Sequence, residues 1–413
     1  MSKIADITPF EILDSRGNPT IEVEMTSSSG ISARASVPSG ASKGSHEALE
    51  IRDGDEMRFG GLGVLKAIQL IETIIKPKLI GFELGNQKGL DDLLISLDGT
   101  RNKGVLGANS ILGISLSYAR LSAQEGGIPL YVHIASEFRF DPKSSNVTPM
   151  FNVINGGLHG SGTIDMQEFL IIPHYTLPFM QKLQMGVELY HSIKKKLHEN
   201  RKMTSVGDEG GFTPQFYTNN EVLKFLSSSI APYQNSFHIG LDCAATTYFK
   251  QGRYKLIDFK DSSDASLYIQ YLEKIIKEFH IVSLEDGLAE DAWTDWAKLT
   301  QRVGNSCMIV GDDLLVTNKE RLEKAIQSRS CTAILVKVNQ VGTLTETYEV
   351  IRIAKQAGFR VIISHRSGET TDDFIADLAV GTGADFVKFG APARGERVAK
   401  YNRLFHIYTK LQK

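Results

Sequence analysis

The sequence is poor in cysteine and tryptophan and contains no long apolar run. Its 413 residues include 3 cysteines and 2 tryptophans. Cys243, Cys307 and Cys331 lack the spacing of a metal site, and their odd number argues against a disulfide framework, so we expect them to be buried and reduced. No apolar run approaches the roughly 20 residues of a membrane span, and the first residues lack the apolar core of a signal peptide. We therefore expect a cytoplasmic protein.

The sequence also has no large net charge of either sign. The formal net charge is -2, which gives no electrostatic argument for a nucleic-acid or membrane partner. A hydrophobic content of 42% and a charged content of 23% are typical of a soluble globular chain. Because 413 residues exceed one compact core of ordinary size, we expect two domains, one of them a barrel.

The N-terminal part has the pattern of a small α+β domain. Residues 4–37 alternate between apolar and polar positions on either side of two turns, which predicts a three-stranded antiparallel meander. Residues 38–45 are small and show no periodicity, so they are either a plain connector or an active-site lid. Helical patterns follow over 64–75, 87–97 and 108–124. A polar stretch with prolines at 136–149 marks the boundary, which predicts an N-terminal domain of residues 1–135 and a catalytic domain of residues 136–413.

The C-terminal part repeats one pattern, an apolar strand that stops at a charged residue. The strand-like runs are 238–242, 281–285, 308–312, 333–340, 361–366 and 385–388. From Glu285 onward the charged ends recur every roughly 25 residues with a helical segment between them, which is about the length of one βα unit. This spacing predicts an α/β fold in which parallel strands bring the charged groups to one rim, where α/β barrels carry their active sites.

Three of these strand ends carry carboxylates. Asp242, Glu285 and Asp312 are hard oxygen ligands at equivalent positions, which indicates a Mg²⁺ site. Each acid alone is equally well explained as the cap of the following helix. Their repetition at three equivalent places favours the metal.

Ionisable residues also stand inside apolar strands. Lys337 and Lys388 are expected on the side of the barrel mouth that faces the acids, either as structural ion pairs or as groups whose charged form is disfavoured by burial near cations. Glu168, Glu209 and His159 are expected to form an acid and base wall opposite the lysines. The segment 364–368 adds a guanidinium and hydroxyl groups that suit a phosphate or carboxylate.

Together these groups are suited to one chemistry. A lysine base, glutamate acids, bound metal and an anion clamp fit removal of a proton next to a carboxylate, followed by loss of a leaving group. Because such a proton is a very weak acid, electrostatic stabilisation must supply most of the barrier reduction.

Several long motifs resemble the enolase family along essentially the whole chain and in the family's order. They lie at residues 14–20, 207–212, 283–291, 337–340 and 364–370. The resemblance implies a barrel with an antiparallel first strand pair, preceded by the smaller domain with its meander, and at least a homodimer. It also implies the reversible dehydration of 2-phosphoglycerate to phosphoenolpyruvate, a step of glycolysis and gluconeogenesis, with two Mg²⁺ ions per active site, the second bound with the substrate.

Carried over position by position, the resemblance assigns roles to these residues. Lys337 is similar to the base that removes the C2 proton, and Glu209, assisted by Glu168, to the acid that helps the C3 hydroxyl to leave. The implied metal ligands are Asp242, Glu285 and Asp312 for the first ion and Ser42, in the lid, for the second. The implied substrate contacts are Arg366 and Ser367 for the phosphate, Lys388 for the carboxylate, and His159, His365 and Gln167 as further groups.

The sequence departs from the family pattern at three positions. Lys43 stands in the lid where threonine is typical, Leu158 precedes His159 where serine is usual, and Gly395 follows Arg394 where serine or threonine is common. None removes a proposed catalytic group. Lys43 adds positive charge near the metals, so it either weakens closure of the lid or helps to bind the phosphate. Two other functions stay open from the residues alone, an acid-sugar dehydratase and a non-catalytic binding protein with the same fold.

Overall fold

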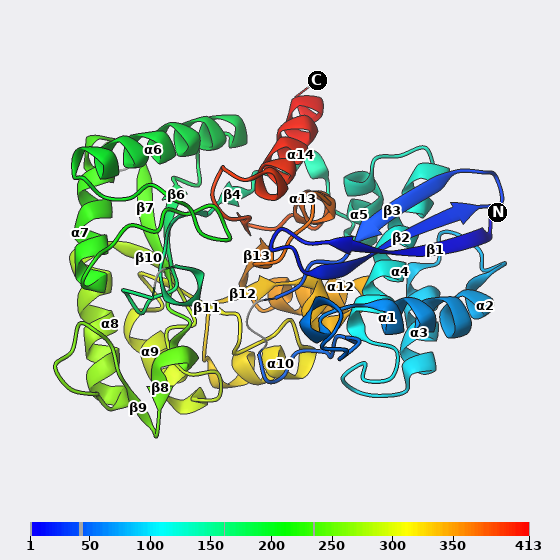
Figure 1. Ribbon diagram of the computed structural model, residues 1–413. Helices are drawn as coiled ribbons and strands as arrows, with labels where there is room; N and C mark the ends of the chain where they lie inside the picture. The colour runs from blue at the N-terminus through cyan, green and yellow to red at the C-terminus, as the bar shows by residue number, and fades with distance from the viewer. Residues whose placement is uncertain (1, 41–43, 161, 234–235, 413) are drawn as a thin grey trace.

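The computed structural model describes residues 2–40, 44–160, 162–233 and 236–412. Ser42 and Lys43, which carry the predictions for the lid, lie outside these ranges. Figure 1 shows an α/β barrel with the N-terminal three-stranded sheet and its helices packed on one side of it.

The N-terminal sheet is the antiparallel meander that the sequence predicts. Strand β1 (Ile4–Leu13) pairs with β2 (Pro19–Ser27), and β2 pairs with β3 (Ser32–Ser36). The first turn is held by Asp14, whose Oδ1 accepts hydrogen bonds from the backbone N–H groups of Arg16 at 2.8 Å and Asn18 at 2.9 Å. The apolar face of the sheet packs against α4 (Ala108–Glu125), where Gly113 lets the helix approach the strands closely.

The other helices of this domain differ in one place from the prediction. The expected helix at 64–75 is α1 (Leu65–Leu70), followed by a π-helical turn η2 (Ile71–Ile75) and by α2 (Lys76–Leu79). Pro77 lacks an N–H donor and cannot continue a regular α-helical ladder, which accounts for the wider turn before it. The remaining helices are α3 (Gln87–Asp98) and α5 (Leu130–Phe138). The predicted boundary at 135/136 falls within α5 and stays a prediction.

The second sheet forms the barrel. Its strands, in spatial order, are β4 (Thr148–Pro149), β14 (Phe386–Lys388), β13 (Arg360–Ser364), β12 (Ala333–Val336), β11 (Met308–Gly311), β10 (Ile281–Glu285), β7 (Phe237–Asp242), β6 (Glu168–Pro173) and β5 (Phe151–Asn155). Only Met150 separates β4 from β5, so this stretch pairs with β14 on one side and with β6 on the other, which closes the ring. Strand β6 runs antiparallel to both β5 and β7, and the other pairings are parallel. The predicted fold class is therefore confirmed.

Helices cover the outside of the ring, and apolar side chains fill its inside. The outer helices are α6 (Phe179–Glu199), α7 (Asn219–Ile230), α8 (Ala265–Phe279), α9 (Trp293–Val303), α10 (Lys319–Ser328), α12 (Leu344–Gln356), α13 (Phe374–Gly381) and α14 (Gly395–Leu411) (Figure 1). Shorter elements are the hairpin β8 (Phe249–Lys250) and β9 (Arg253–Tyr254), the turn α11 (Val338–Val341), and the 3-10 turns η1 (Phe59–Gly61), η3 (Pro142–Ser144), η4 (Gly157–His159), η5 (Ala231–Tyr233) and η6 (Ala245–Tyr248). The barrel interior is filled by Met150, Leu170, Ile172, Val310, Ala333, Leu335 and Ile362. Because this plug closes the barrel from inside, only the strand ends are open to a ligand.

Two predictions drawn from the scarcity of cysteine and of apolar runs can be compared with the structure. Within the described residues, Cys243, Cys307 and Cys331 are buried and form no disulfide, as expected. None of the helices in the described part of the chain combines the length and the apolar character needed to cross a bilayer.

Helix α6 depends on a glycine where it packs on the barrel. A Cβ atom at Gly186 would overlap the ring of Phe151 on β5, whereas one at Gly395, the first residue of α14, would meet nothing within 4 Å. We predict that Gly186→Ala destabilises the fold by roughly 1–3 kcal/mol in spite of the better helix propensity of alanine. Gly395→Ala is the matched control and is expected to change stability by less than about 0.5 kcal/mol. Thermal unfolding of the two variants measures this, and equal midpoints would contradict the packing argument.

Candidate active site

The charged residues meet at the carboxyl ends of the barrel strands, around one small polar cavity. Of the predicted site residues, those that line it are His159, Gln167, Glu168, Glu209, Asp242, Asp312, Lys337, His365, Arg366, Ser367 and Lys388. Glu285 is fully buried beside the cavity, in contact with Lys388. Ser42 lies outside the described residues. The structure thus brings the described members of the predicted set together, although they come from segments more than 200 residues apart in the sequence.

Lys388 is the centre of the charge cluster. It ends β14, and its Nζ lies 2.9 Å from Asp242 Oδ2, 2.9 Å from Glu285 Oε2 and 3.2 Å from Glu168 Oε2. Burial alone would lower the pKa of Lys388, but Asp242, Glu168 and Glu285 outweigh it and hold the pKa well above its usual value. The ammonium group therefore stays charged and compensates the buried acids.

Lys337 forms a second ion pair with the acids. Its Nζ contacts Oδ2 of Asp312, and Gln340 Nε2 donates to Oδ1 of the same carboxylate at 2.9 Å. Burial acts to lower the pKa of Lys337, and the charge of Asp312 more than offsets this, so the net pKa is raised. The carboxyl group of Asp312 has a lowered pKa because Lys337 outweighs the effect of burial.

The strand that carries Lys337 is shorter than the sequence pattern predicts. Strand β12 ends at Val336 rather than continuing to Gln340, and residues 338–341 form the turn α11. Backbone pairing stops there because Lys337 N–H donates instead to the hydroxyl of Thr317 at 3.0 Å. The lysine consequently leaves the barrel wall at its rim, where its side chain reaches the cavity.

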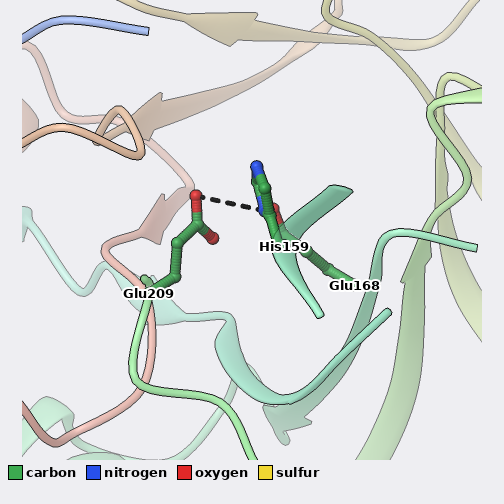
Figure 2. Close-up of side chains that lie close together, drawn as sticks. All are labelled: His159, Glu168 and Glu209. Atoms are coloured by element: carbon green, nitrogen blue, oxygen red, sulfur yellow. Dashed lines mark ion pairs between the residues drawn. The ribbon is translucent and has the colours of Figure 1, made fainter. Parts of the chain in front are cut away.

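His159, Glu168 and Glu209 form the predicted wall of acids and base (Figure 2). His159 Nδ1 lies 3.5 Å from Glu168 Oε1 and 3.5 Å from Glu209 Oε1. Burial acts to lower the pKa of His159, but Glu209 and Glu168 raise it overall. All three side chains are buried, so their charges interact strongly.

The two glutamates of this wall have pKa values that are pushed apart. Burial and then the charge of Glu209 raise the pKa of Glu168 to about 7. Burial acts to raise the pKa of Glu209 as well, but His159 and His365 overcome it and hold it well below the usual value. In the absence of bound ions Glu168 therefore binds a proton more readily than Glu209. Two carboxyl groups tuned in opposite directions are typical of an acid/base site.

Arg366 and its neighbours form the anion clamp. The guanidinium makes a bidentate ion pair with Glu47, at 2.9 Å and 3.2 Å, and donates to Asn339 Oδ1 at 3.1 Å. Ser367 is buried beside it and also lines the cavity. The clamp is braced by the N-terminal domain, because Ser39 pairs with Gly368 in an isolated antiparallel bridge. Both domains thus shape the site.

Several residues of this site were not predicted from the sequence. Glu47 follows residues 38–45, which show no periodic pattern, so its pairing with Arg366 gave no local signal. Asp286 accepts hydrogen bonds from the backbone N–H groups of Asp312 at 3.0 Å and Asp313 at 2.8 Å, which fixes the loop after β11. Burial raises the pKa of Asp313 to about 7. The acidic doublets 285–286 and 312–313 were visible signals for these two residues.

Asp242, Glu285 and Asp312 supply carboxylate oxygens of the kind that a divalent cation binds. Burial, and then the nearby charges of Asp242 and Asp312, raise the pKa of Glu285 well above its usual value, so these acids carry more negative charge than the surroundings stabilise. Within the described residues these three acids do not form one set whose oxygens all lie within 4.8 Å of one another, although Asp312 forms such a set with Asp286 and Asp313. The ammonium groups of Lys388 and Lys337 contact the three acids instead. Hard oxygen donors that carry excess negative charge fit Mg²⁺.

Leu158 and Gly395, two of the positions that depart from the family pattern, leave the site residues unchanged. Leu158 is 66% exposed in the turn η4, so it does not fill the position behind His159. Gly395 begins α14 and is not a contact of the cavity in the described residues.

Family models match both parts of the chain. Residues 4–134 match the model described as the enolase N-terminal domain, and residues 145–413 match the model described as the enolase C-terminal TIM barrel domain. The second match alone covers well over half of the chain.

The raised pKa of Glu168 predicts a pH dependence of stability in the protein without metal. Because the folded state holds a proton up to about pH 7 that the unfolded state releases near 4.5, the stability of the native chain falls as the pH rises through this window. Glu168→Gln cannot titrate, so we predict that its stability relative to the native chain increases between pH 5 and 8, by up to about 3 kcal/mol.

Urea unfolding in the presence of a chelator measures this difference. The control is Glu273→Gln, which removes a carboxylate that is 46% exposed on the outer surface and should leave the pH dependence unchanged. A constant difference between Glu168→Gln and the native chain across this range would show that Glu168 is ionised throughout.

Proposed function

Because the chain belongs to the enolase family, we propose that it is a phosphopyruvate hydratase, a carbon–oxygen lyase that reversibly dehydrates 2-phosphoglycerate to phosphoenolpyruvate. The observation that carries the proposal is the placement of the base and the acids. Lys337 follows β12, and Glu168 is the first residue of β6. These two strands lie on opposite sides of the ring. If β4 and β5 are counted as one strand, three strands separate β12 from β6 in either direction around the barrel. A substrate in the cavity would therefore have the lysine on one face and the carboxyl groups on the other.

Substrate binding uses the cationic arc of the rim. Arg366 and Ser367 are suited to the phosphate, because a guanidinium offers two parallel donors to phosphate oxygens. Lys388 is suited to the substrate carboxylate. His159, His365 and Gln167 line the same cavity and complete the polar contacts.

The reaction moves two protons. The amine of Lys337 removes the proton from C2, and the electron pair left behind forms the C2–C3 double bond as the C3–O bond breaks. The pair of Glu209 and Glu168 assists the departing hydroxyl, which takes its proton from Glu168 and leaves as water. The reverse reaction uses the same groups in the opposite protonation states.

Asp242, Glu285 and Asp312 are the residues that would hold a first Mg²⁺, and Ser42 with the lid is proposed to contribute to a second. When bound, these ions would stabilise negative charge on the substrate carboxylate. They would also weaken the ion pairs between the acids and the lysines, which favour the protonated lysines. Without them Lys337 stays paired with Asp312 and protonated. We therefore expect activity to require the metal.

We further propose that the protein acts in the cytoplasm, in glycolysis and gluconeogenesis, as a homodimer or larger homo-oligomer. Size-exclusion chromatography with light scattering measures the oligomeric state, and a monomer at micromolar concentration would contradict that part of the proposal.

The test of the function is the formation of the conjugated product, followed by ultraviolet absorbance after addition of 2-phosphoglycerate and Mg²⁺. We predict turnover that excess chelator abolishes and that Lys337→Ala reduces by roughly 10²- to 10⁴-fold, since the variant lacks the base. Lys298→Ala is the control, because that lysine is 60% exposed on α9 and remote from the cavity. Absence of turnover at saturating Mg²⁺, or full activity of Lys337→Ala, would rule out the proposal.

A further inference from the structure

Arg397 is a buried cation on α14 that the proposed reaction does not use. Its side chain is fully buried, and it is not among the residues that line the cavity in the described part of the chain. Its guanidinium donates to His365 Nδ1 at 2.7 Å, to the carbonyl oxygens of Arg366 and Ser367, each at 2.6 Å, and to that of Asp208 at 3.0 Å. One side chain therefore joins the loop that carries the anion clamp to the loop that carries Glu209.

The contact with His365 determines the tautomer of the imidazole. A guanidinium has donors only and stays charged, so the nitrogen that faces it must be an acceptor. Nδ1 of His365 is therefore unprotonated. A neutral ring then carries its hydrogen on Nε2. This buried atom makes no hydrogen bond within the described residues, and Glu209 Oε2 lies 3.3 Å from it, so the carboxylate is placed to receive this N–H after a small rotation.

The surroundings of His365 favour this neutral form. Burial lowers the pKa of His365 to about 3, although Glu209 acts to raise it. Arg397 and Lys388 are the cations that face the ring, and both oppose a second positive charge. Gly390, with φ +79, lies beside the ring edge, where a Cβ atom would stand 3.0 Å from His365 Cε1.

From this geometry we propose that Arg397 is a positioning residue that holds His365 as the Nε2–H tautomer and so directs an N–H donor, rather than a lone pair, at Glu209. The donor would stabilise Glu209 as a carboxylate, together with Asn152, whose Nδ2 donates to Oε2 at 3.0 Å. The proton that leaves with the hydroxyl then comes from Glu168. The kinetic part of this inference rests on the proposed function, whereas the tautomer does not.

The tautomer is tested directly by nitrogen NMR of the native protein with ¹⁵N-labelled histidine rings, with the His365 signal identified by its loss in His365→Gln. We expect a neutral ring with the hydrogen on Nε2 at pH 7. In Arg397→Met we expect the signal to shift toward a mixture of tautomers or an imidazolium. A Nδ1–H ring or an imidazolium in the native protein, or an unchanged Nε2–H ring in Arg397→Met, would overturn the proposal whether or not the protein turns over 2-phosphoglycerate.

A double-mutant cycle separates positioning from a purely structural role. We expect Arg397→Met to lower kcat by roughly 10- to 100-fold, as loss of a supporting hydrogen bond commonly does, and Arg397→Lys to restore part of it. In the His365→Gln background the same substitution should change kcat by less than about 3-fold, because residues that act through one another are not additive. If Arg397→Met lowers kcat by the same factor with and without His365→Gln, the kinetic part of the proposal is overturned.

The matched control is Arg403→Met on the same helix. Arg403 makes a bidentate ion pair with Asp377, at 2.7 Å and 2.6 Å, away from the cavity. Its loss should lower stability and leave both kcat and the His365 signal unchanged. If Arg397→Met does not fold, the tautomer in the native protein and in Arg397→Lys still decides the proposal. Failure of the native protein to convert 2-phosphoglycerate, with the expected tautomer present, would reject the proposed function alone.

Discussion

The compensation of buried charge at the carboxyl end of the barrel governs this structure. Asp242, Glu285 and Glu168 are withdrawn from water and share the single ammonium group of Lys388. Removing one partner from such a cluster leaves an uncompensated charge in a medium of low dielectric, which costs several kcal/mol. The lysine is therefore held in place by the acids, and its positive charge offsets part of the cost of burying them. Hydrophobic residues at these positions would give a more stable barrel and no site.

The barrel makes this arrangement possible because its topology spaces the charges around a ring. The acids of β7, β10 and β11 occupy consecutive strands, Lys337 and Arg366 follow the next two, and Lys388 ends β14. The interior plug below them excludes water from one side. The N-terminal domain covers the other side with Glu47 and Ser39, whose contacts reach the loop of Arg366. Because Arg366 is already paired with Glu47, a bound phosphate would have to share the guanidinium with that carboxylate or displace it.

Much of this arrangement could be predicted from the sequence because it depends on local pattern. A run of apolar residues that ends at Asp242 or Glu285 indicates both a buried strand and the position of its last residue, and parallel strands bring such ends together. The meander was likewise predicted from its alternation, whereas the antiparallel first pair was predicted only from the resemblance to the enolase family; both agree with the structure.

What the pattern could not predict depends on contacts between distant segments. The pairing of Glu47 with Arg366 and the four contacts of Arg397 join residues that lie far apart in the sequence, and no periodicity marks them. The predicted end of the strand that carries Lys337 was wrong for the same reason, since the hydroxyl of Thr317 takes the N–H that would have continued the ladder. The division of pKa values between Glu168 and Glu209 also arises from this packing, because both are glutamates in the sequence and differ only in their neighbours.

The separate roles of the lysine and the glutamates are tested most directly by the exchange of the C2 hydrogen of 2-phosphoglycerate with solvent, followed by NMR in deuterated water with Mg²⁺. We assign proton removal to Lys337 and departure of the hydroxyl to the glutamate pair on the opposite side of the ring. We predict that Glu168→Gln retains C2 exchange while forming little phosphoenolpyruvate, and that Lys337→Ala loses both. Loss of exchange in Glu168→Gln, or exchange that persists in Lys337→Ala, would contradict this division of roles.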